Sequence, residues 1–366
     1  MVRGSWRRSP IASRRRCSAV RALRTASVML DLTGPQRPWP AALVSAFGDS
    51  QANALRTQGA WGPPRPGGDV RLINRLVELF DVPTDRVCIT SGVRGFAAAW
   101  ADSSRTMLVE APGFTPLPAI LGASGKIRRG DWNELFTVAE EAEKRLSLWL
   151  TSPGRNPDGR SMSTAESTRL RALARKGHHV VVNQVYRWHA AELPSSIHVW
   201  TVNSLSKVSG GGSRLGWATF PPDATLPVAL TQSGPATIWQ RTWADFLSPA
   251  TWQTLLRQCV EPTTEARLAF VERLRENLGW YPDGAGDGVS VLLRVDGISE
   301  SQMVERFRAE SLRVSPGASF DAPHPSVRIA FSGVSAEQAD RAAECVTRFA
   351  SSLPSLTPDY PASRGC

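Results

Sequence analysis

The stretch Asn203-Ser-Leu-Ser-Lys-Val-Ser-Gly-Gly-Gly-Ser-Arg-Leu-Gly-Trp217 decides how the rest of the chain is interpreted. It places Lys207 directly after a predicted strand, among small hydroxyl residues and glycines. A lysine can form an imine with an aldehyde when its surroundings favour the neutral amine. Glycines allow close approach of the backbone, and Ser204, Ser206 and Arg214 can bind a phosphate. Taken alone, the same run is also compatible with an ordinary turn.

On the N-terminal side of this stretch, short apolar runs alternate with helical patterns. The runs that predict strands lie at residues 86–90, 106–110, 146–151, 179–183 and 198–202. The patterns that predict helices lie at 70–80, 96–102, 116–123 and 163–176, and the last opens with a capping box from Ser163 to Glu166. Several strands are apolar on both faces, as buried parallel strands are. The alternation predicts a doubly wound α/β sheet.

The pattern changes beyond about residue 240. A long helical stretch at 251–278, with a break or kink expected near Pro262, comes first. Strands at 289–295 and 327–331 and helices at 300–310 and 336–353 follow, which indicates a smaller α+β domain. We therefore expect a basic leader at 1–28, a large domain at 29–245 and a small domain at 246–366.

The net charge of +10 belongs to the first residues of the chain. Residues 1–28 hold eight arginines and no acidic residue, which leaves a net charge of only +2 for the rest. This segment is compatible with a nucleic-acid or membrane-surface arm, a targeting peptide, or a start codon placed upstream of a true start at Met29. The nearly neutral remainder argues against a nucleic-acid partner, and no apolar run is long enough to span a membrane.

The cysteines and histidines show no pattern of a metal site or a disulfide framework. The five cysteines are scattered and odd in number, which favours a reducing cytoplasm. Only His178 and His179 are adjacent, and they precede an apolar run in a way that suggests a helix end. We therefore expect no metal.

Four further segments hold residues that suit a phosphorylated aromatic cofactor. Residues 89–96 (ITSGVRGF) form a strand, a glycine turn and a helix start, whose N–H groups suit a phosphate. Residues 109–114 (VEAPGF) end in an aromatic residue that can stack on a ring. Residues 152–159 (SPGRNPDG) hold an asparagine that can donate to a cofactor oxygen, and residues 180–186 (VVVNQVY) place Asn and Tyr at a strand end. Each segment alone is compatible with an ordinary turn or core position.

Together and in this order, these segments resemble the class I/II aminotransferase superfamily, the fold type I enzymes that depend on pyridoxal 5′-phosphate (PLP). The resemblance covers roughly residues 60–350, and the runs GSRLGWA and NPDG look like the alliinase and plant tryptophan-aminotransferase branch. It implies an α/β fold with a large, mostly parallel sheet and a smaller C-terminal domain. It also implies PLP as cofactor, an amino acid substrate and a homodimer with composite active sites.

The resemblance also implies roles for individual residues. Lys207 matches the lysine that holds PLP as a Schiff base and moves the α-proton of the substrate. Arg328, within SVRIAF, matches the arginine that binds the substrate α-carboxylate through two hydrogen bonds. The positions that match cofactor-binding residues, at the phosphate, the ring face, the phenolic oxygen or the ring nitrogen, are Gly92, Val93, Arg94, Phe114, Asn156, Asn183, Tyr186, Ser204, Ser206 and Arg214.

Two positions depart from the family pattern. Asn183 stands where family members normally carry an aspartate, whose charge keeps the ring nitrogen of PLP protonated. A neutral amide can bind that nitrogen but cannot stabilise its positive charge, so the ring should withdraw electrons less strongly. The second departure is the spacing of seven residues between Lys207 and Arg214, one shorter than the family pattern, which is expected to shift the grip on the phosphate.

The sequence therefore predicts an aminotransferase-like enzyme that acts at the α-carbon of an amino acid. The alternative is a PLP-dependent lyase or β/γ-replacement enzyme, which Asn183 moderately favours because early departure of a leaving group needs less electron withdrawal. A catalytically degenerate member is a further alternative, against which the joint presence of Lys207, Arg214, Tyr186, Asn156 and Arg328 argues. A DNA-binding regulator would need a helix-turn-helix domain, which about 30 leading residues cannot supply. The residues do not specify the substrate.

Overall fold

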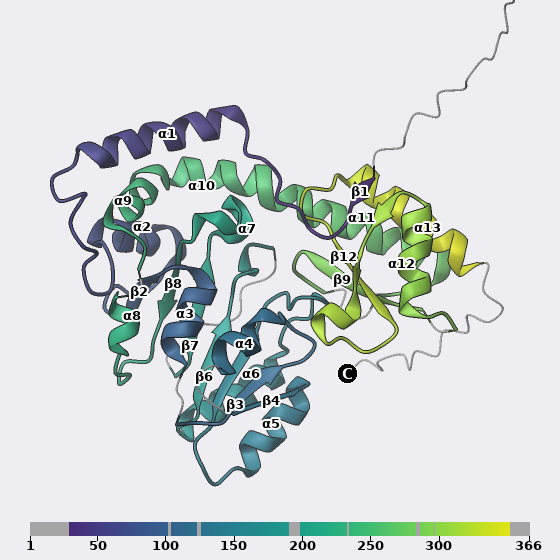
Figure 1. The fold of residues 1–366 in the computed structure, drawn as a ribbon, viewed down its shortest axis with the longest axis horizontal. Coiled ribbons are helices and arrows are strands. Elements are labelled where there is room, and N and C mark those ends of the chain that lie inside the picture. Colours follow the sequence, from purple (N-terminus) through teal and green to yellow (C-terminus); the bar gives the residue numbers. More distant parts are fainter. Residues whose placement is uncertain are drawn as a thin grey trace, which may run out of the picture.

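The computed structural model describes residues 29–101, 104–122, 126–189, 198–232, 234–282, 286–295 and 297–351. Figure 1 shows a larger part built around a sheet and a smaller part beside it, joined by a long helical segment. The leader expected at residues 1–28 and the last residues of the expected C-terminal helix lie outside the described residues. No helix in the described ranges has the length and apolar character needed to cross a membrane.

In the larger part, the described residues form a sheet of seven strands. Its order is β2 (Val87–Thr90), β8 (Gly216–Thr219), β7 (Trp200–Ser204), β6 (His179–Asn183), β5 (Ser147–Thr151), β3 (Met107–Glu110) and β4 (Ile127–Gly130). β8 runs antiparallel to both of its neighbours, and the other pairs are parallel. The mostly parallel α/β sheet expected from the sequence is therefore confirmed.

Two of these strands were not expected from the sequence, for different reasons. β4 is a half-buried edge strand with two arginines, so it has no apolar run. β8 lies within the glycine-containing stretch that was interpreted as a loop, and it is buried between two strands. The five expected strands were found with boundaries within two residues of the prediction.

Helices cover both faces of the sheet because alternate strand residues point to opposite sides. Trp149 and Val181 face α3 (Gly92–Trp100) and α4 (Pro116–Gly122) in one apolar cluster. Leu148 and Val180 face α5 (Trp132–Glu141) and α6 (Thr164–Arg175) in another. The predicted capping box of α6 is present. His178 and His179 do not end this helix as expected, because α6 ends at Arg175 and His179 opens β6.

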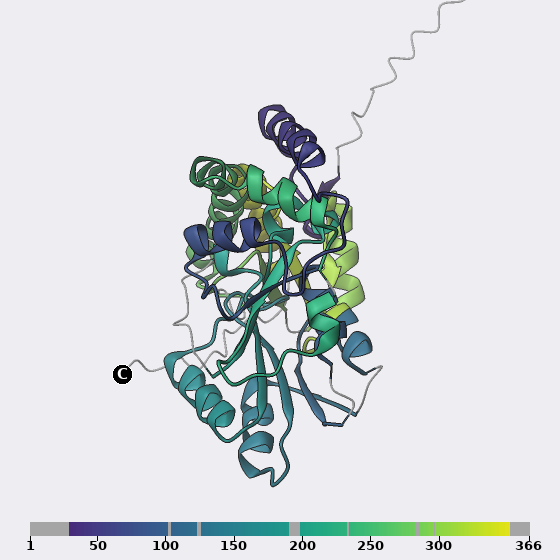
Figure 2. The same ribbon diagram turned by 90° about the vertical axis from the view of Figure 1, so that its left-hand side faces the viewer.

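A third cluster, rich in tryptophan, lies between the sheet and the helices α1 (Ala41–Arg56), α2 (Val70–Phe80) and α9 (Thr237–Phe246). Figure 2 shows α1 as the outermost helix at this end of the molecule. Trp39 and Trp239 lie in this cluster and donate hydrogen bonds of 2.6 Å to the carbonyl oxygens of Val208 and Ser213. The cluster therefore holds both sides of the glycine run that follows Lys207.

The smaller part begins with a long helical segment that contains an irregular turn. α10 (Pro249–Leu255) passes through a π-helical turn at Leu256–Val260 into α11 (Glu261–Leu278). The irregularity lies directly before Pro262, which confirms the break expected there, since a proline removes one N–H from the helical ladder.

The smaller part packs α11, α12 (Glu300–Ala309) and α13 (Ala336–Ala350) against a short sheet. This sheet pairs β9 (Ser290–Arg294) with β12 (Ser326–Ala330), and β12 with β11 (Ser315–Pro316). The N-terminal strand β1 (Leu30–Asp31) runs parallel to β10 (Leu312–Arg313), and Leu32 is fully buried among the C-terminal residues. The first described residues therefore lie beside β12.

Candidate active site

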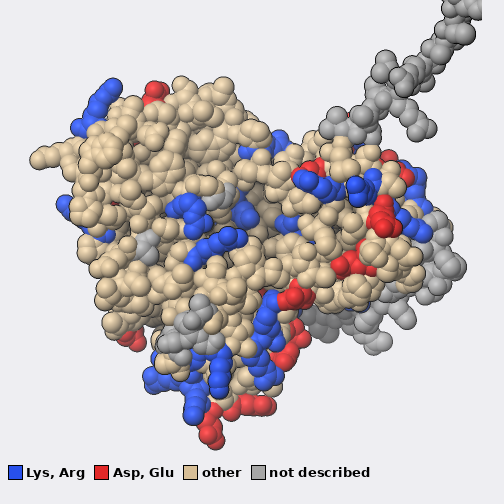
Figure 3. Space-filling model, in the orientation of Figure 1, with Lys and Arg blue, Asp and Glu red and all other residues tan. Residues whose placement is uncertain are grey.

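The predicted site residues gather where the parallel strands end. β2, β3, β5, β6 and β7 all run in the same direction, so their carboxyl ends meet at one edge of the sheet. Lys207 lies in the short helix α7 (Ser206–Ser209), which follows β7 after one residue. Its Nζ lies 4.8 Å from the centroid of the Tyr186 ring. Figure 3 shows a hollow between the two parts, with lysine and arginine side chains gathered around it.

Gly92, Ser204 and Arg214 form a cradle at the start of α3. A Cβ atom on Gly92 would lie 3.6 Å from Ser204 Oγ and 3.8 Å from an Arg214 guanidinium nitrogen, and Gly92 has a φ of +75°. A Cβ on Gly216 would lie only 2.9 Å from the Cα of Gly92. The shortened spacing between Lys207 and Arg214 therefore still brings the arginine to the N-terminus of α3, where N–H groups and a guanidinium suit a phosphate.

The two serines of this motif have structural tasks other than the phosphate binding expected of them. The Ser204 hydroxyl donates to the Leu215 carbonyl at 2.9 Å and accepts from the backbone N–H of Ser206 at 3.1 Å. Ser204 thus braces the turn, and its hydroxyl proton is already engaged. The Ser206 backbone starts α7, so Ser206 positions the residue that follows it, Lys207.

Asn156 and Tyr186 lie on neighbouring loops. The loop of Asn156 contacts the tyrosine, since a Cβ on Gly154 would lie 3.1 Å from Tyr186 Cβ. Tyr186 is buried, and Asn156 Oδ1 is a buried atom with no hydrogen-bond partner among the described residues. Buried polar atoms in proteins are nearly always paired, so an unpaired amide oxygen on a loop that contacts Tyr186 is a candidate ligand-binding atom.

Asn183 ends β6 and is almost fully buried. Its Oδ1 accepts a hydrogen bond of 3.2 Å from the backbone N–H of Val185, and its Nδ2 donates to the Thr151 hydroxyl at 3.3 Å. The amide is therefore tied to the ends of two neighbouring strands.

Phe114 and the first turn of α3 are also close to each other. The Arg94 guanidinium lies 4.9 Å from the centroid of the Phe114 ring, a distance typical of a cation–π contact. Val93 packs against the small apolar cluster of Val185 and Tyr186. Val93, Arg94 and Phe114 thus lie on the same edge as Lys207, with Arg94 exposed to solvent.

Arg328 reaches this edge from the smaller part. It is buried on β12, and its Nη1 donates to the Thr33 carbonyl at 3.0 Å, while its Nε has no partner in the described part of the chain. Burial lowers the pKa of the guanidinium, and the electrostatic influence of Tyr186 partly offsets this effect. Arginine stays charged in proteins, so Arg328 offers a buried cation on the Tyr186 side of the site.

Sequence reasoning missed three other groups near this edge. Thr33 and Gly34 lie against the Arg328 guanidinium, although they are far from it in the sequence. His189 is buried, and neither ring nitrogen has a hydrogen-bond partner in the described ranges. Burial, together with the charges of Lys207 and Arg267, lowers its pKa to about 3. The sequence did offer a hint to His189, because it lies three residues after Tyr186, which the sequence had already assigned to the site.

The third missed group is a carboxyl buried next to β5. Glu110 Oε2 accepts hydrogen bonds from Trp132 Nε1 at 2.8 Å and from the backbone N–H of Thr151 at 2.9 Å. Burial raises its pKa to about 7, while Arg155 and these hydrogen bonds act in the opposite direction. Its sequence context, the end of an apolar strand, gave no indication of this network.

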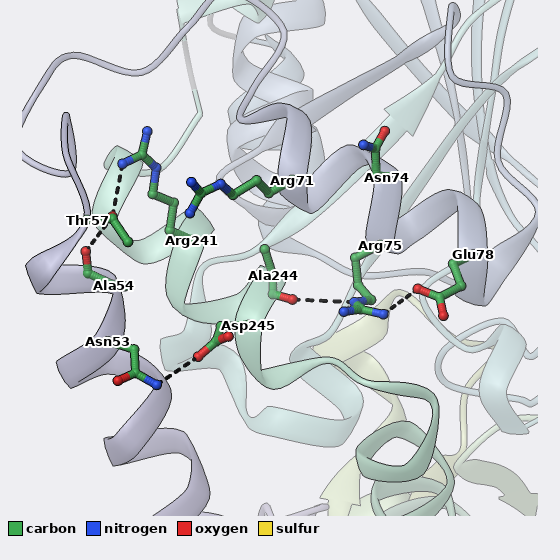
Figure 4. Close-up of a pocket in the computed structure, with 10 residues that line it drawn as sticks. All are labelled: Asn53, Ala54, Thr57, Arg71, Asn74, Arg75, Glu78, Arg241, Ala244 and Asp245. Carbon is green, nitrogen blue, oxygen red and sulfur yellow. Dashed lines mark hydrogen bonds and ion pairs between the residues drawn. The ribbon is translucent and has the colours of Figure 1, made fainter.

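A separate cavity of about 390 Å³ lies between α1, α2 and α9 (Figure 4). None of the predicted site residues lines it. Two of its arginines already have partners, since Arg75 contacts Glu78 across the lining and Arg241 contacts Asp69 outside it. We therefore place the candidate active site at the edge of the sheet and not in this cavity.

The residues present fit PLP and do not suggest a metal. The Gly92 cradle suits its phosphate, the unpaired Asn156 oxygen is a candidate partner for a polar ligand, and Lys207 supplies an amine over the Tyr186 ring. Within the described ranges, no group of three or more His, Cys, Asp or Glu side chains is arranged to hold a metal ion.

Solved structures with the same architecture are aminotransferases. A double mutant of aspartate aminotransferase from Thermus thermophilus has a TM-score of 0.72 and 21% identity, over 88% of this chain and 91% of that one. An aminotransferase from Mycobacterium tuberculosis has a TM-score of 0.74 and 19% identity, over 90% and 93%. The α-aminoadipate aminotransferase from Thermus thermophilus, complexed with N-(5′-phosphopyridoxyl)-L-leucine, has a TM-score of 0.72 and 19% identity, over 89% and 94%. The fold is that of the fold type I PLP enzymes.

The family follows from the sequence comparison. The family model "Aminotransferase class I and II" matches residues 40–346, so the chain belongs to this family. Its members are PLP-dependent, which confirms the expected superfamily and cofactor. A search of curated proteins finds no match. The resemblance to the alliinase branch stays a prediction.

Proposed function

We propose that this chain is an aminotransferase that acts at the α-carbon of an α-amino acid, with Lys207 as the catalytic residue. The observation that carries the proposal is the position of the Lys207 amine. It lies over the Tyr186 ring, on the same edge of the sheet as Gly92 and Arg214, which suit a phosphate. When bound, PLP supplies an aldehyde that reacts with amines and a ring that withdraws electrons from the α-carbon of an amino acid.

Each part of the edge has a task in this proposal. The first turn of α3 and Arg214 hold the phosphate, and Asn156 and Tyr186 bind the phenolic oxygen. Phe114 covers one ring face, and Asn183 contacts the ring nitrogen. The Lys207 amine holds the cofactor and then, once free, takes the proton from the α-carbon as a general base.

Arg328 binds the substrate α-carboxylate in this proposal. Its Nη1 already donates to Thr33, so Nε and the remaining N–H groups are the donors for a carboxylate. Because Arg328 lies on β12 and Lys207 lies on α7, the substrate would join the two parts of the molecule. We also propose that the chain works as a homodimer, which sedimentation of the purified protein would test.

A PLP-dependent lyase or replacement enzyme is the second candidate, and Asn183 is the observation that favours it. A neutral amide at the ring nitrogen weakens the electron withdrawal on which reversible transamination depends. A substrate with a β-leaving group would need that withdrawal for a shorter time. Release of a 2-oxo acid without any added 2-oxo acid acceptor would favour the lyase over simple transamination.

The test of the proposed function is the absorption spectrum of the full chain. We expect a visible band from PLP bound to lysine, and we expect Lys207→Ala to lose that band together with at least about a thousandfold of activity, since loss of a covalent catalyst costs at least this much. Lys176 is a matched control, because its amine donates to the Glu140 carbonyl at the exposed end of α5, away from the predicted site residues. Lys176→Ala should keep both band and activity. A full chain that stays colourless with PLP would refute the proposal.

A further inference from the structure

The amide of Asn183 has only one orientation that its hydrogen bonds allow. The backbone N–H of Val185 lies 3.2 Å from one side-chain atom of Asn183, and a backbone N–H can only donate. The atom that faces Val185 must therefore be Oδ1, which leaves Nδ2 toward Thr151 at 3.3 Å. One N–H of Nδ2 serves the Thr151 hydroxyl, and the second N–H remains.

The hydrogen bonds beyond Thr151 also have a fixed donor-to-acceptor direction. The backbone N–H of Thr151 and the indole N–H of Trp132 both donate to Glu110 Oε2, at 2.9 and 2.8 Å. The Thr151 side chain also hydrogen-bonds the Glu110 carboxyl. Since both N–H groups are donors only, Oε2 accepts whether or not the carboxyl carries a proton. Along this series of hydrogen bonds, the donor-to-acceptor direction therefore runs from Asn183 through Thr151 to Glu110.

The charges around this network do not replace the missing aspartate. Glu110 meets Asn183 only through Thr151. Arg155, itself buried, acts on the Glu110 carboxyl and also pairs with Asp158, while Arg129 donates to the Glu110 carbonyl at 3.1 Å. Arg155 and Arg129 therefore act electrostatically on the Glu110 carboxyl itself.

We propose that Asn183 presents an N–H donor to the ring nitrogen of PLP, so that this chain binds the cofactor with its ring nitrogen unprotonated, and that Thr151 and Glu110 are the positioning residues that impose this polarity. The proposal rests on the proposed function, in which Asn183 contacts that nitrogen. A protonated nitrogen would point a donor at a donor and leave both without an acceptor, which buried groups avoid.

This polarity narrows the class of reaction. An unprotonated ring withdraws electrons from the α-carbon less strongly than a protonated one. Reactions in which a leaving group departs soon after the α-proton is removed are affected least. Of the two candidate functions, the inference therefore favours the lyase or replacement enzyme, with amino acids that carry a β-leaving group as its substrates.

The test is the ¹⁵N NMR resonance of ring-labelled PLP bound to the full chain, followed as the pH is changed. We expect the position of an unprotonated nitrogen in the wild type throughout the range in which the protein is folded. In Asn183→Asp a carboxylate replaces the amide, and we expect the pKa of the nitrogen to rise by about 1–3 units. A protonated nitrogen in the wild type, or the same resonance in Asn183→Asp, would overturn the inference while PLP binding stands. Failure to bind PLP at all would overturn the proposed function and the inference with it.

The positioning role has its own pair of variants. Thr151→Val removes the hydroxyl that accepts from Asn183, and Thr151→Ser keeps it. We expect Thr151→Val to weaken PLP binding about fivefold, the effect of one hydrogen bond, and to shift the ¹⁵N resonance. Thr151→Ser should behave as the wild type in both measurements. Equal affinities and resonances for the two variants would show that Thr151 does not position Asn183.

Discussion

The edge of the large sheet and the core of the smaller part differ in whether their buried atoms have partners. In the core, Phe270, Phe307 and Phe331 are fully buried among apolar neighbours. At the edge, buried polar atoms of Asn156, His189 and Arg328 have no hydrogen-bond partner among the described residues. An unsatisfied buried polar group costs about 1–3 kcal/mol. The core therefore stabilises the fold, while the edge holds unpaired polar groups that are available to a bound ligand.

The comparison indicates why the site is divided between the two parts. Arg328 belongs to β12, which the apolar core supports, whereas Lys207 follows β7 of the large sheet. Burial of a charged group costs free energy unless it has partners, and Arg328 has the Thr33 carbonyl and the Phe320 ring. The smaller part thus carries a buried cation on the Tyr186 side of the candidate site.

The largest expected effect is a loss of stability from a change in the core of the smaller part. Phe331→Ala removes a fully buried ring from the core, and we expect it to lower the free energy of unfolding by about 3–5 kcal/mol. Leu268 lies on α11 and is half exposed, so Leu268→Ala should change stability by no more than about 0.5 kcal/mol. Urea denaturation of both variants measures the difference. Similar losses for both would mean that the core is not the stabilising region.

The second expected effect is stabilisation of the edge by its ligand. If PLP supplies partners to the unsatisfied atoms, a concentration of about 100 times Kd should raise the free energy of unfolding by about 2.7 kcal/mol. Arg214→Gln weakens the phosphate cradle and should need more PLP for the same increase in Tm. Thermal melts with and without PLP measure both. An unchanged Tm at saturating PLP would contradict the comparison.

The smallest expected effect concerns His189 in the absence of ligand. Burial holds its pKa at about 3 in the folded state, below its value in the unfolded chain, so the unfolded state binds the proton more readily. Stability is then fully present above about pH 6.5 and is lost as the pH falls, by about 2 kcal/mol at about pH 5. His189→Gln should remove this acid sensitivity, measured by urea denaturation across that range. His198 is exposed, so His198→Gln serves as the control and should keep the acid sensitivity of the wild type. A loss of stability on acidification that survives in His189→Gln would contradict the prediction.

The fold was predictable wherever one sequence pattern dominates an element. The five expected strands are short and apolar, and α6 announces its start through Ser163 and Glu166. β8 was missed because its residues Gly216 and Trp217 follow no strand pattern in the sequence. They form a strand only by pairing with β2 and β7. β1 was missed because two residues are too short to carry a period.

The sequence by itself determined the class of the protein and the identity of its reactive groups. Lys207, Arg214, Asn156, Tyr186 and Arg328 are chemical types set in a characteristic order, and order along the chain needs no folding to be recognised. Asn183 was likewise visible as a neutral residue in place of a charged one.

Only the tertiary structure decided how these groups meet. The contact of Thr33 with Arg328 and the path from Asn183 through Thr151 to Glu110 join residues from separate strands, which sequence distance does not encode. Hydrogen-bond direction depends on which donors and acceptors face each other once the strands are packed. For this reason the amide at position 183 could be read from the sequence, but its polarity came from the fold.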